Sequence, residues 1–429
     1  MIDIRLIREN KDAVLRNLEK RHDREKMQWL DIIERADGSC RKLDFDAQNL
    51  RRKRNEATES IAKLLKAGKG KDAEKAKEGV KRINDEISLK ETEMEGLKAE
   101  IEGYLMRLPN ILHDSVPVGK SEEDNVEIRK WGAAKKPDFK VKSHVDILQD
   151  LDLADIERAG KISGARFYFL KKELVLLDLA LARFALDMLV KKGFIPMLVP
   201  YMIRKEPYQG VTDLADFENV LYKIENEDLY LIATSEHAIG GMRMNEIMLE
   251  KELPLKYAGF SACFRKEAGA HGKDTKGIFR VHQFHKVEQF VFSKPEESWK
   301  IHEELIKNAE DIFQALGLPY RIVNVCTGDI GTVAAKKYDL EVWMPAQGKY
   351  REAVSCSNCT DYQSRRLNIR YGIDGEKAKG HVHTLNATAM ATTRAIAAIL
   401  ENFQTSDGKV EIPKALQPYM GGVKVIGRN

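Results

Sequence analysis

The sequence predicts an α+β protein in which a long N-terminal antiparallel helical hairpin precedes a domain built on a central, mostly antiparallel sheet flanked by helices. Two observations carry this prediction. Apolar residues recur every three or four positions through the N-terminal quarter, as in a coiled coil. From about Val145 onward, amphipathic helical patterns alternate with short apolar and β-branched runs that lack a regular βαβ rhythm.

The hairpin follows from two apolar seams. The first contains Trp29, Ile33, Ala36, Cys40, Leu43, Ala47, Leu50, Arg54, Ala57, Ile61 and Leu64, and the second contains Ala76, Val80, Ile83, Ile87, Lys90, Met94, Leu97, Ile101 and Tyr104. Two glycines between the seams supply a turn, Asp72 is expected to cap the second helix, and Pro109 ends it. Residues 1–109 therefore form the predicted arm, and the proline- and glycine-containing segment 110–138 is the predicted connector.

An isolated hairpin buries only one narrow apolar stripe between its helices, so we expect it to extend to a distant binding partner. Helices of this length extend on the order of 50 to 60 Å. Basic residues cluster between Arg41 and Arg82, a pattern that suits phosphate contacts. The alternatives are a solvated coiled-coil face with interleaved glutamates, a dimerisation coiled coil and a protein-docking arm.

Composition sets limits on the class of protein. The 43% hydrophobic content suits a folded chain, and no run of roughly 18 apolar residues could cross a bilayer. The first ten residues have no apolar signal core, so we expect a cytoplasmic protein whose five cysteines stay thiols. The net charge of +4 says little about nucleic acid by itself.

The elements of the second domain, 139–429, are placed by pattern. We expect a helix over Leu170 to Lys192 and strands near Met197–Pro200, Leu229–Ala233, Ala258–Phe264, Gln283–Phe292, Tyr320–Val325, Leu340–Met344 and Tyr350–Val354. Neither a P-loop nor a strand-linked GxGxxG motif is present, so a nucleotide would have to be held in another way.

The most informative stretch is Phe264-Arg265-Lys266-Glu267-Ala268-Gly269 followed by Arg280-Val281-His282-Gln283-Phe284-His285-Lys286-Val287-Glu288. Two expected strands enclose a polar loop, and each carries an arginine and a glutamate. Arginine suits phosphate oxygens, carboxylates accept from amines, and Phe284 offers a face to a base. The alternative is two surface strands with ordinary ion pairs.

This block resembles the second signature motif of class II aminoacyl-tRNA synthetases, and its individual residues resemble those of the seryl branch of that family. Lys192-Gly193-Phe194-Ile195-Pro196 through Pro200 resembles the first motif, which forms the dimer interface in that family. Thr384-Leu385-Asn386-Ala387-Thr388 leading to Arg394 resembles the third. Residues 231–236 and 351–359 also read as seryl-type, so the resemblance covers essentially the whole chain, with 139–429 as the catalytic domain.

The resemblance implies a serine–tRNA ligase that uses ATP and Mg²⁺, works as a homodimer and binds serine tRNA through its arm, with no membrane or DNA partner. It leaves open whether selenocysteine tRNA is also charged.

The resemblance also implies the residues of the site. The implied catalytic residues are Arg265, Glu267 and Arg394. The implied ATP ligands are Arg265, Lys266, Glu267, Arg280, Val281, Phe284, Glu352, Ala353, Val354, Ser355 and Arg394, with Glu352 and Ser355 holding Mg²⁺. The implied serine ligands are Thr234, Ser235, Glu236, Arg265, Glu288, Asn386 and Thr388. The tRNA contacts assigned to the arm are Arg51, Arg52, Arg54, Lys63, Lys75 and Arg82.

Elementary chemistry agrees with this set. A serine carboxylate is ionised at pH 7, so its attack on the α-phosphorus needs positioning and charge neutralisation and no general base. A pocket that hydrogen-bonds a hydroxyl also rejects an analogue without one by about 10⁴ to 10⁵.

Other interpretations remain beside the leading one. Cys356 and Cys359 with His381 and His383 have the spacing of a zinc site, although the resemblance places these cysteines beside the Mg²⁺ ligands. The adenylating domain could instead serve a carrier protein, but the relatives that do so lack the long basic arm. A third hypothesis is a nucleic-acid-binding protein whose synthetase-like domain is inactive, against which the retained charged residues argue.

Overall fold

The computed structural model describes residues 1–134, 137–213, 217–267 and 276–427. The chain divides into two compact units, Ile2–Leu108 and Pro109–Asn429, and Met1 groups with the second. None of the helices in these described ranges combines the length and apolar character needed to cross a membrane.

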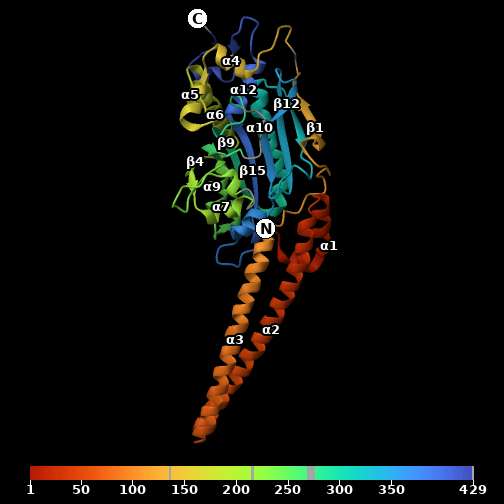
Figure 1. Cartoon of the computed structure of the whole chain (residues 1–429), viewed down its shortest axis with the longest axis vertical. Helices are drawn as coiled ribbons and strands as arrows, with labels where there is room; N and C mark the ends of the chain where they lie inside the picture. Colours follow the sequence, from red (N-terminus) through yellow and green to blue (C-terminus); the bar gives the residue numbers. More distant parts are fainter. Residues whose placement is uncertain (135–136, 214–216, 268–275, 428–429) are drawn as a thin grey trace. The chain divides into compact units, whose positions relative to one another are not determined.

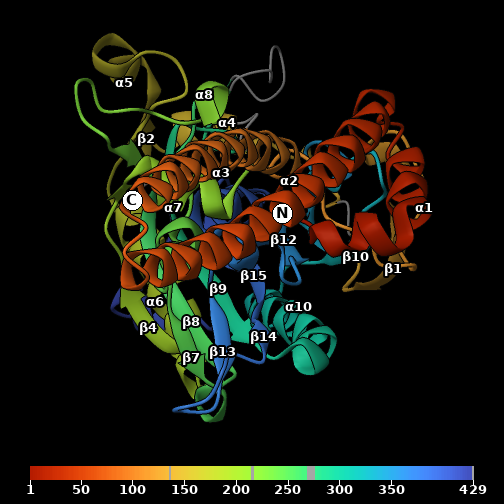
Figure 2. The same ribbon diagram turned by 90° about the horizontal axis from the view of Figure 1, so that it is seen from below.

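The N-terminal unit is a helical hairpin with a short extra helix. Its helices are α1 (Ile4–Lys20), α2 (Arg24–Lys66) and α3 (Gly70–Leu105). α2 and α3 run side by side in Figures 1 and 2. The Trp29 and Tyr104 ring centroids lie 5.4 Å apart, and Lys90 Nζ lies 3.5 Å from Asp46 Oδ2, so the two helices are antiparallel as predicted.

The ends of these helices differ in detail from the prediction. Gly68 has φ +71° in the turn, a conformation that glycine adopts without strain. The expected cap at Asp72 is wrong, because α3 begins at Gly70 with Lys69 as its N-cap and no side-chain capping bond. Asp72 lies in the first turn instead, where a negative charge interacts favourably with the helix dipole.

The second unit contains an eight-stranded sheet with one parallel pair. In spatial order its strands are β1 (Val126–Trp131), β10 (Tyr320–Asn324), β11 (Lys336–Met344), β12 (Lys349–Asn358), β15 (His383–Ala391), β9 (Gln283–Ser293), β8 (Leu255–Phe264) and β4 (Ile195–Leu198). Only β4 and β8 are parallel, and every other neighbouring pair is antiparallel. The predicted mostly antiparallel sheet is confirmed.

One face of this sheet is covered by helices. The main core joins the sheet to α6 (Glu173–Lys191), α10 (Ser298–Leu316) and α12 (Thr392–Asn402), which carry rows of buried leucine, isoleucine, alanine and phenylalanine. Figure 2 shows α10 beside the strands of the sheet. A smaller core lies under α7 (Lys205–Val211) and α9 (Ser235–Gly241).

Short elements complete the unit. The remaining helices are α4 (His144–Asp150), α5 (Ile156–Ser163), α8 (Phe217–Val220) and α11 (Tyr362–Arg366). The remaining strands pair in small sheets and are β2 (Ala154–Asp155), β3 (Phe169–Leu170), β5 (Met202–Ile203), β6 (Tyr230–Leu231), β7 (Ile247–Leu249), β13 (Arg370–Gly372), β14 (Gly380–His381), β16 (Val410–Glu411) and β17 (Val425–Ile426).

The expected connector 110–138 is more structured than its composition indicates. It contributes strand β1, which pairs with β10 at one edge of the main sheet. The amide of Asn110 also donates to the backbone oxygens of Val333 and Cys359, at 2.9 and 2.8 Å. These contacts fix the start of the segment beside the loop 330–334.

Candidate active site

A cavity of about 420 Å³ lies on the face of the sheet that α10 leaves open. Strand β9 shows how the sequence divides its two faces. Val287 and Val291 pack in the main core, whereas Phe284, Lys286 and Glu288 line the cavity. Successive side chains of a strand point to opposite faces, so this alternation separates the core from the chemistry.

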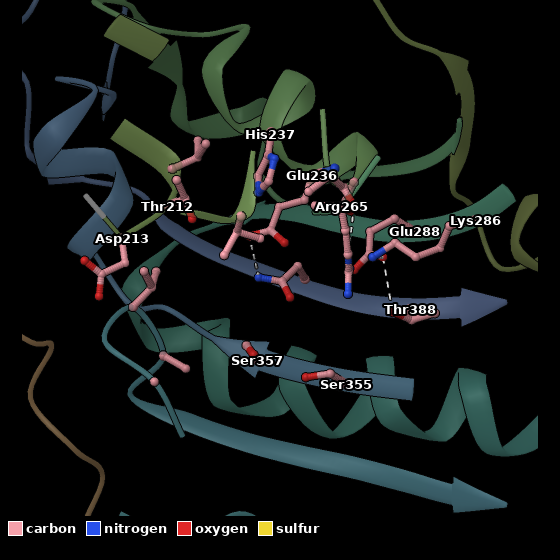
Figure 3. A pocket seen from close by; sticks show the side chains of 18 of the residues that line it. Thr212, Asp213, Glu236, His237, Arg265, Lys286, Glu288, Ser355, Ser357 and Thr388 are labelled. Atoms are coloured by element: carbon pink, nitrogen blue, oxygen red, sulfur yellow. Dashed lines mark hydrogen bonds and ion pairs between the residues drawn. The ribbon is translucent and has the colours of Figure 1, made fainter. Parts of the chain in front are cut away.

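The neighbouring strands repeat the division. On β15, Leu385 and Ala387 belong to the core, and Asn386 and Thr388 line the cavity. On β12, Val354 and Cys356 are core residues, and the cavity is lined by Glu352, Ser355 and Ser357. Figure 3 shows Glu236, Arg265, Lys286 and Glu288 gathered in one region, with Ser355 and Ser357 on an adjacent strand.

The N-terminus of α9 brings Thr234 and Glu236 to the cavity. The Thr234 hydroxyl caps the helix by accepting from the Glu236 N–H at 3.3 Å. The Ser235 hydroxyl donates to the Gly259 carbonyl oxygen of β8 at 3.1 Å. A Cβ at Gly259 would lie 2.5 Å from Ser235 Oγ, so this close approach requires glycine.

Two buried carboxylates occupy this end of the cavity. Glu236 Oε1 accepts from Gln363 Nε2 at 3.1 Å and from Asn386 Nδ2 at 3.0 Å. Glu288 Oε2 forms an ion pair with Lys286 Nζ and accepts from the Thr388 hydroxyl at 3.3 Å (Figure 3). Glu236 therefore has neutral amide donors, whereas Glu288 has a cation.

These surroundings shift the pKa values of the site. Burial, reinforced by Glu288, raises the pKa of Glu236 to about 7, against the opposing effects of Lys286, Gln363 and Arg265. Burial also lowers the pKa of His237 to about 3, helped by Lys286 and Arg265. His237 is accordingly a neutral wall of the cavity.

The other end of the cavity carries a carboxylate–arginine pair. Arg394 Nη1 donates to the Glu352 carbonyl oxygen at 2.9 Å and lies 3.2 Å from Glu352 Oε1. Enclosure acts to raise the pKa of Glu352, but Arg394, Lys337 and Arg265 together lower it to about 2. Glu352 is thus an anion at any physiological pH. Arg265 lies nearby, with its guanidinium 5.3 Å from the Phe284 ring centre.

The donors around Glu352 fit a magnesium ion. A carboxylate and the Ser355 hydroxyl are hard oxygen ligands, and Mg²⁺ binds proteins through one or two such groups while keeping phosphate and water ligands. Asp339 lies across from Ser355 in the β11–β12 register, and its Oδ1 is buried without a hydrogen-bond partner. Burial raises the pKa of Asp339 to about 7.

The zinc alternative finds no support in the geometry. Cys356 Sγ contacts the His302 carbonyl oxygen at 3.7 Å, whereas Cys359 Sγ accepts from Asn386 Nδ2 at 3.6 Å. His383 Nδ1 lies 2.8 Å from Ser298 Oγ. Within the described part of the chain, no group of three or more His, Cys, Asp and Glu side chains could hold a metal.

Most of the predicted site residues line this one cavity, namely Thr234, Glu236, Arg265, Phe284, Glu288, Glu352, Ala353, Ser355, Asn386, Thr388 and Arg394.

The other predicted site residues do not line this cavity. Glu267 has φ +48° and accepts from Arg280 Nη1 at 3.0 Å, and Lys266 lies over the Tyr222 ring. Arg280 lines a second cavity, of about 670 Å³, that shares Glu352 and Arg394 with the first. Ser235, Val281 and Val354 are buried. Ala268 and Gly269 of the same motif fall outside the described residues.

The sequence interpretation missed several lining residues. Lys286, His237 and Ser357 line the cavity, as does the loop 330–334. Lys286 and Ser357 follow the period-two rule on strands that already carried predicted ligands, so that pattern could have found them. The loop has no local signal of this kind.

The fold and cavity can now be compared with known proteins. The family model of the class II tRNA synthetase core domain (G, H, P, S and T) matches residues 220–403. The mostly antiparallel sheet, with a cavity of arginines and carboxylates on its open face, is that of a class II aminoacyl-tRNA synthetase. The seryl-tRNA synthetase N-terminal domain model matches residues 1–112.

Relatives extend the match to full length. The chain is 56% identical to a serine–tRNA ligase of Methanocella arvoryzae over 427 residues, covering 99% of this chain and 100% of the relative. A crystal structure of seryl-tRNA synthetase from Pyrococcus horikoshii complexed with ATP superimposes with a TM-score of 0.96, at 54% identity and 100% coverage of both chains. A cytoplasmic serine–tRNA ligase from Naegleria fowleri in complex with AMP gives a TM-score of 0.90 at 37% identity, covering 99% of this chain and 98% of that one. The chain belongs to the seryl-tRNA synthetase family.

Proposed function

We propose that this protein is a serine–tRNA ligase, in which L-serine reacts with ATP to give seryl-adenylate and pyrophosphate, and the seryl group then passes to the 3′-terminal ribose of serine tRNA with release of AMP. The observation that carries the proposal is one cavity that joins an end with two carboxylates to an end with the Arg394–Glu352 pair, with Arg265 between them. The first suits an ammonium and a hydroxyl, and the second suits a polyphosphate.

At the serine end, Glu236 and Glu288 bind the ammonium and hydroxyl groups, together with Thr234 and Thr388. Asn386 supports Glu236 through its 3.0 Å hydrogen bond. Arg265 lies between the two ends, where it neutralises the serine carboxylate and the α-phosphate as they approach. No general base is required, because the attacking carboxylate is already ionised.

At the nucleotide end, Phe284 and Arg394 hold the adenine between them, and Glu267 lies near its edge. Arg394 must exchange its contacts with Glu352 for contacts with ATP, because it cannot make both at full strength. Glu352 and Ser355 would hold Mg²⁺, which neutralises phosphate charge when it is bound. Arg280, in the adjoining cavity, suits the distal phosphates.

The arm, within residues 1–109, supplies the tRNA contacts of the proposal. Arg52, Lys63, Lys75 and Arg82 are exposed on α2 and α3, and Arg54 is half-buried. Arg51 also pairs with Glu91 at 2.5 Å, so it must be shared between this partner and a phosphate. Sequence-independent phosphate contacts of this kind position a nucleic acid. The proposed division is completed by a connector over 110–138 and a catalytic domain over 139–429.

A homodimer is part of the proposal. Strand β4 lies at the edge of the main sheet, and its Ile195 and Leu198 are exposed. Val175, Leu176 and Leu179 of α6 are exposed as well. Exposed apolar groups of this kind mark protein interfaces. The proposed place of action is the cytoplasm, where five free, buried cysteines stay reduced.

ATP–pyrophosphate exchange with each of the twenty amino acids tests the proposal. We expect exchange with serine, and its loss in Arg265→Ala. Exchange with another amino acid, or none in the native protein, would overturn the assignment.

A further inference from the structure

A buried lysine in the serine end of the cavity has no role in the proposed reaction so far. Lys286 is only 5% exposed, lines the cavity and forms an ion pair with Glu288. A lysine is rarely buried unless it is paired, because its rotamer freedom and hydration are both lost. Figure 3 shows Lys286 beside Glu288 on β9, on the side of the strand that faces Arg265.

The charged side chains gathered around this lysine are two of each sign, counting Lys286 itself, whereas Asp213 also lines the cavity but lies farther from Lys286 (Figure 3). Glu236 of α9 and Glu288 of β9 are the carboxylates, and Lys286 and Arg265 are the cations. The other titratable groups near Lys286 are His237 of α9, which is neutral, and Cys263 of β8, whose pKa is raised by burial. His285, the neighbour on β9, pairs with Asp178 of α6 at 2.6 Å.

Serine adds one charge of each sign to this count. Its carboxylate can pair with Arg265, and its ammonium needs one carboxylate. Glu288 Oε2 already holds Lys286 and Thr388, whereas the side-chain donors to Glu236 among the described residues are the neutral amides of Gln363 and Asn386. The ammonium therefore belongs with Glu236, which leaves Glu288 Oε1 to accept the serine hydroxyl.

We propose that Lys286 is a positioning residue of the serine site, the fixed counter-charge of Glu288 that favours the ionised form of Glu236 and reserves Glu236 for the ammonium group of the substrate. This inference rests on the proposed function. Without Lys286, two buried carboxylates would share one substrate ammonium, and one of them would take up a proton.

The consequence is a defined pH dependence. Lys286 lowers the pKa of Glu236, so its removal raises that pKa further. Serine binding requires the ionised form, and the pH at which the KM for serine begins to rise on acidification must move upward. We expect the KM for ATP to change little, because its proposed ligands other than Arg265 lie toward the other end of the cavity.

The test measures the KM for serine and for ATP by pyrophosphate exchange between about pH 6 and 8.5, a range that brackets the titration of Glu236. Lys286→Met removes the charge, and Lys286→Arg keeps it. Lys256→Met is the matched control, because Lys256 also lies on the main sheet, on β8, and pairs with Glu304 at 2.6 Å away from the cavity.

We expect Lys286→Met to raise the KM for serine at pH 7 by about 10- to 100-fold, as for the loss of a charged hydrogen bond, and to shift the pH midpoint upward by about one unit. Lys286→Arg should restore the native midpoint, and Lys256→Met should match the native protein. An unshifted midpoint with a serine KM within about twofold of the Lys256→Met value would overturn the inference.

A double variant keeps the inference testable if Lys286→Met fails to fold. Lys286→Met with Glu288→Gln removes both charges and leaves no unpaired ion, so it should fold and show a midpoint near the native value. A double variant that fails to fold, or that folds with a strongly raised midpoint, would contradict the inference. Absence of serine exchange in the native protein would instead reject the proposed function.

Discussion

Arg394 of α12 and Glu352 of β12 are joined twice, by a 2.9 Å hydrogen bond to the Glu352 carbonyl oxygen and by a 3.2 Å approach of the same nitrogen to its carboxylate. The two residues are proposed ligands of one nucleotide, and each is the ion-pair partner of the other. Their pairing keeps the charge balanced before ATP and Mg²⁺ arrive.

The Glu352 carboxylate should matter mainly through the metal. Glu352→Gln keeps the shape of the side chain and removes its charge, so we expect serine-dependent exchange to fall by about 10²- to 10³-fold, and its dependence on Mg²⁺ to move to higher concentration. Exchange titrated with MgCl₂, and abolished by a chelator, measures both. The control is Glu304→Gln, since Glu304 pairs with Lys256 at 2.6 Å, away from both cavities. Equal effects of the two changes would contradict the role of Glu352.

The ionised Glu236 carboxylate should lower the stability of the folded protein, although serine binding requires it. Its pKa is raised by burial to about 7, so the folded protein loses stability as the pH rises from the usual range of a glutamate through 7. Glu236→Gln retains an oxygen for Gln363 and Asn386 and carries no charge. At pH 8 the variant should melt at a higher temperature than the native protein and have lost serine activation. A variant that melts lower at pH 8 than at pH 5, relative to the native protein, would refute this account.

Thr388 should contribute to the choice of serine. Its hydroxyl donates to Glu288 at 3.3 Å, and it lies in the proposed hydroxyl pocket. Thr388→Val should lower kcat/KM for serine by about 10- to 100-fold, because buried polar groups lose a partner. Alanine has no hydroxyl to lose, so its weak activation should change little, and the ratio of the two rates is an internal control. A proportional loss for both amino acids would indicate general damage to the site.

The arm should be needed for transfer and dispensable for activation. Cys40 lies opposite Met94 across the hairpin, so residues 41–93 can be replaced by a short glycine-rich turn that joins the two helices at the same level. Serine exchange should persist at the native rate and charging of tRNA should be lost.

Single basic residues of the arm should each contribute about one phosphate contact. Arg52→Ala and Arg82→Ala should each lower the slope of log K for tRNA binding against log salt concentration by about one, with Lys98→Ala as the control outside the basic cluster. Native charging by the shortened protein would reject the role of the arm.

The exposed apolar face should hold two copies together. Leu176→Glu on α6 and Leu198→Glu on β4 place a charge on that face without disturbing the core. We expect both variants to elute as monomers in size-exclusion chromatography with light scattering, and the native protein as a dimer. Leu89→Glu, on the exposed side of α3, is the control. A native monomer would contradict this part of the proposal.

The sequence predicted features that repeat along the chain better than features made by distant contacts. The heptad seams predicted α2 and α3, and the short apolar runs predicted β9 and β10 to within one residue at each end and β8 without its first three residues. Strand β1 was not predicted, because its side chains lie exposed or half-buried at the edge of the sheet and form no buried apolar run. Helix α1 was not predicted as a separate element. Its Val14 and Leu18 are buried in a helix that packs against α2, and the sequence alone does not show this packing.

The candidate site shows the same division. Arg265, Glu288, Glu352 and Arg394 stand in recognisable motifs, and the structure brings them to one cavity. Lys286 stands between two predicted ligands and was passed over, because its importance lies in a charge balance that needs Glu236 of a different element. The loop 330–334 lines the cavity only through contacts with segments far away in sequence.

The most direct test of the central claim is to charge total tRNA with the purified protein and radiolabelled serine, and to identify the charged species by sequencing. The account predicts that tRNAs that decode serine are charged, and that charging stops in Arg265→Ala. Serine-dependent pyrophosphate exchange without charging of any tRNA would contradict it, and would point to delivery of the activated amino acid to a carrier protein.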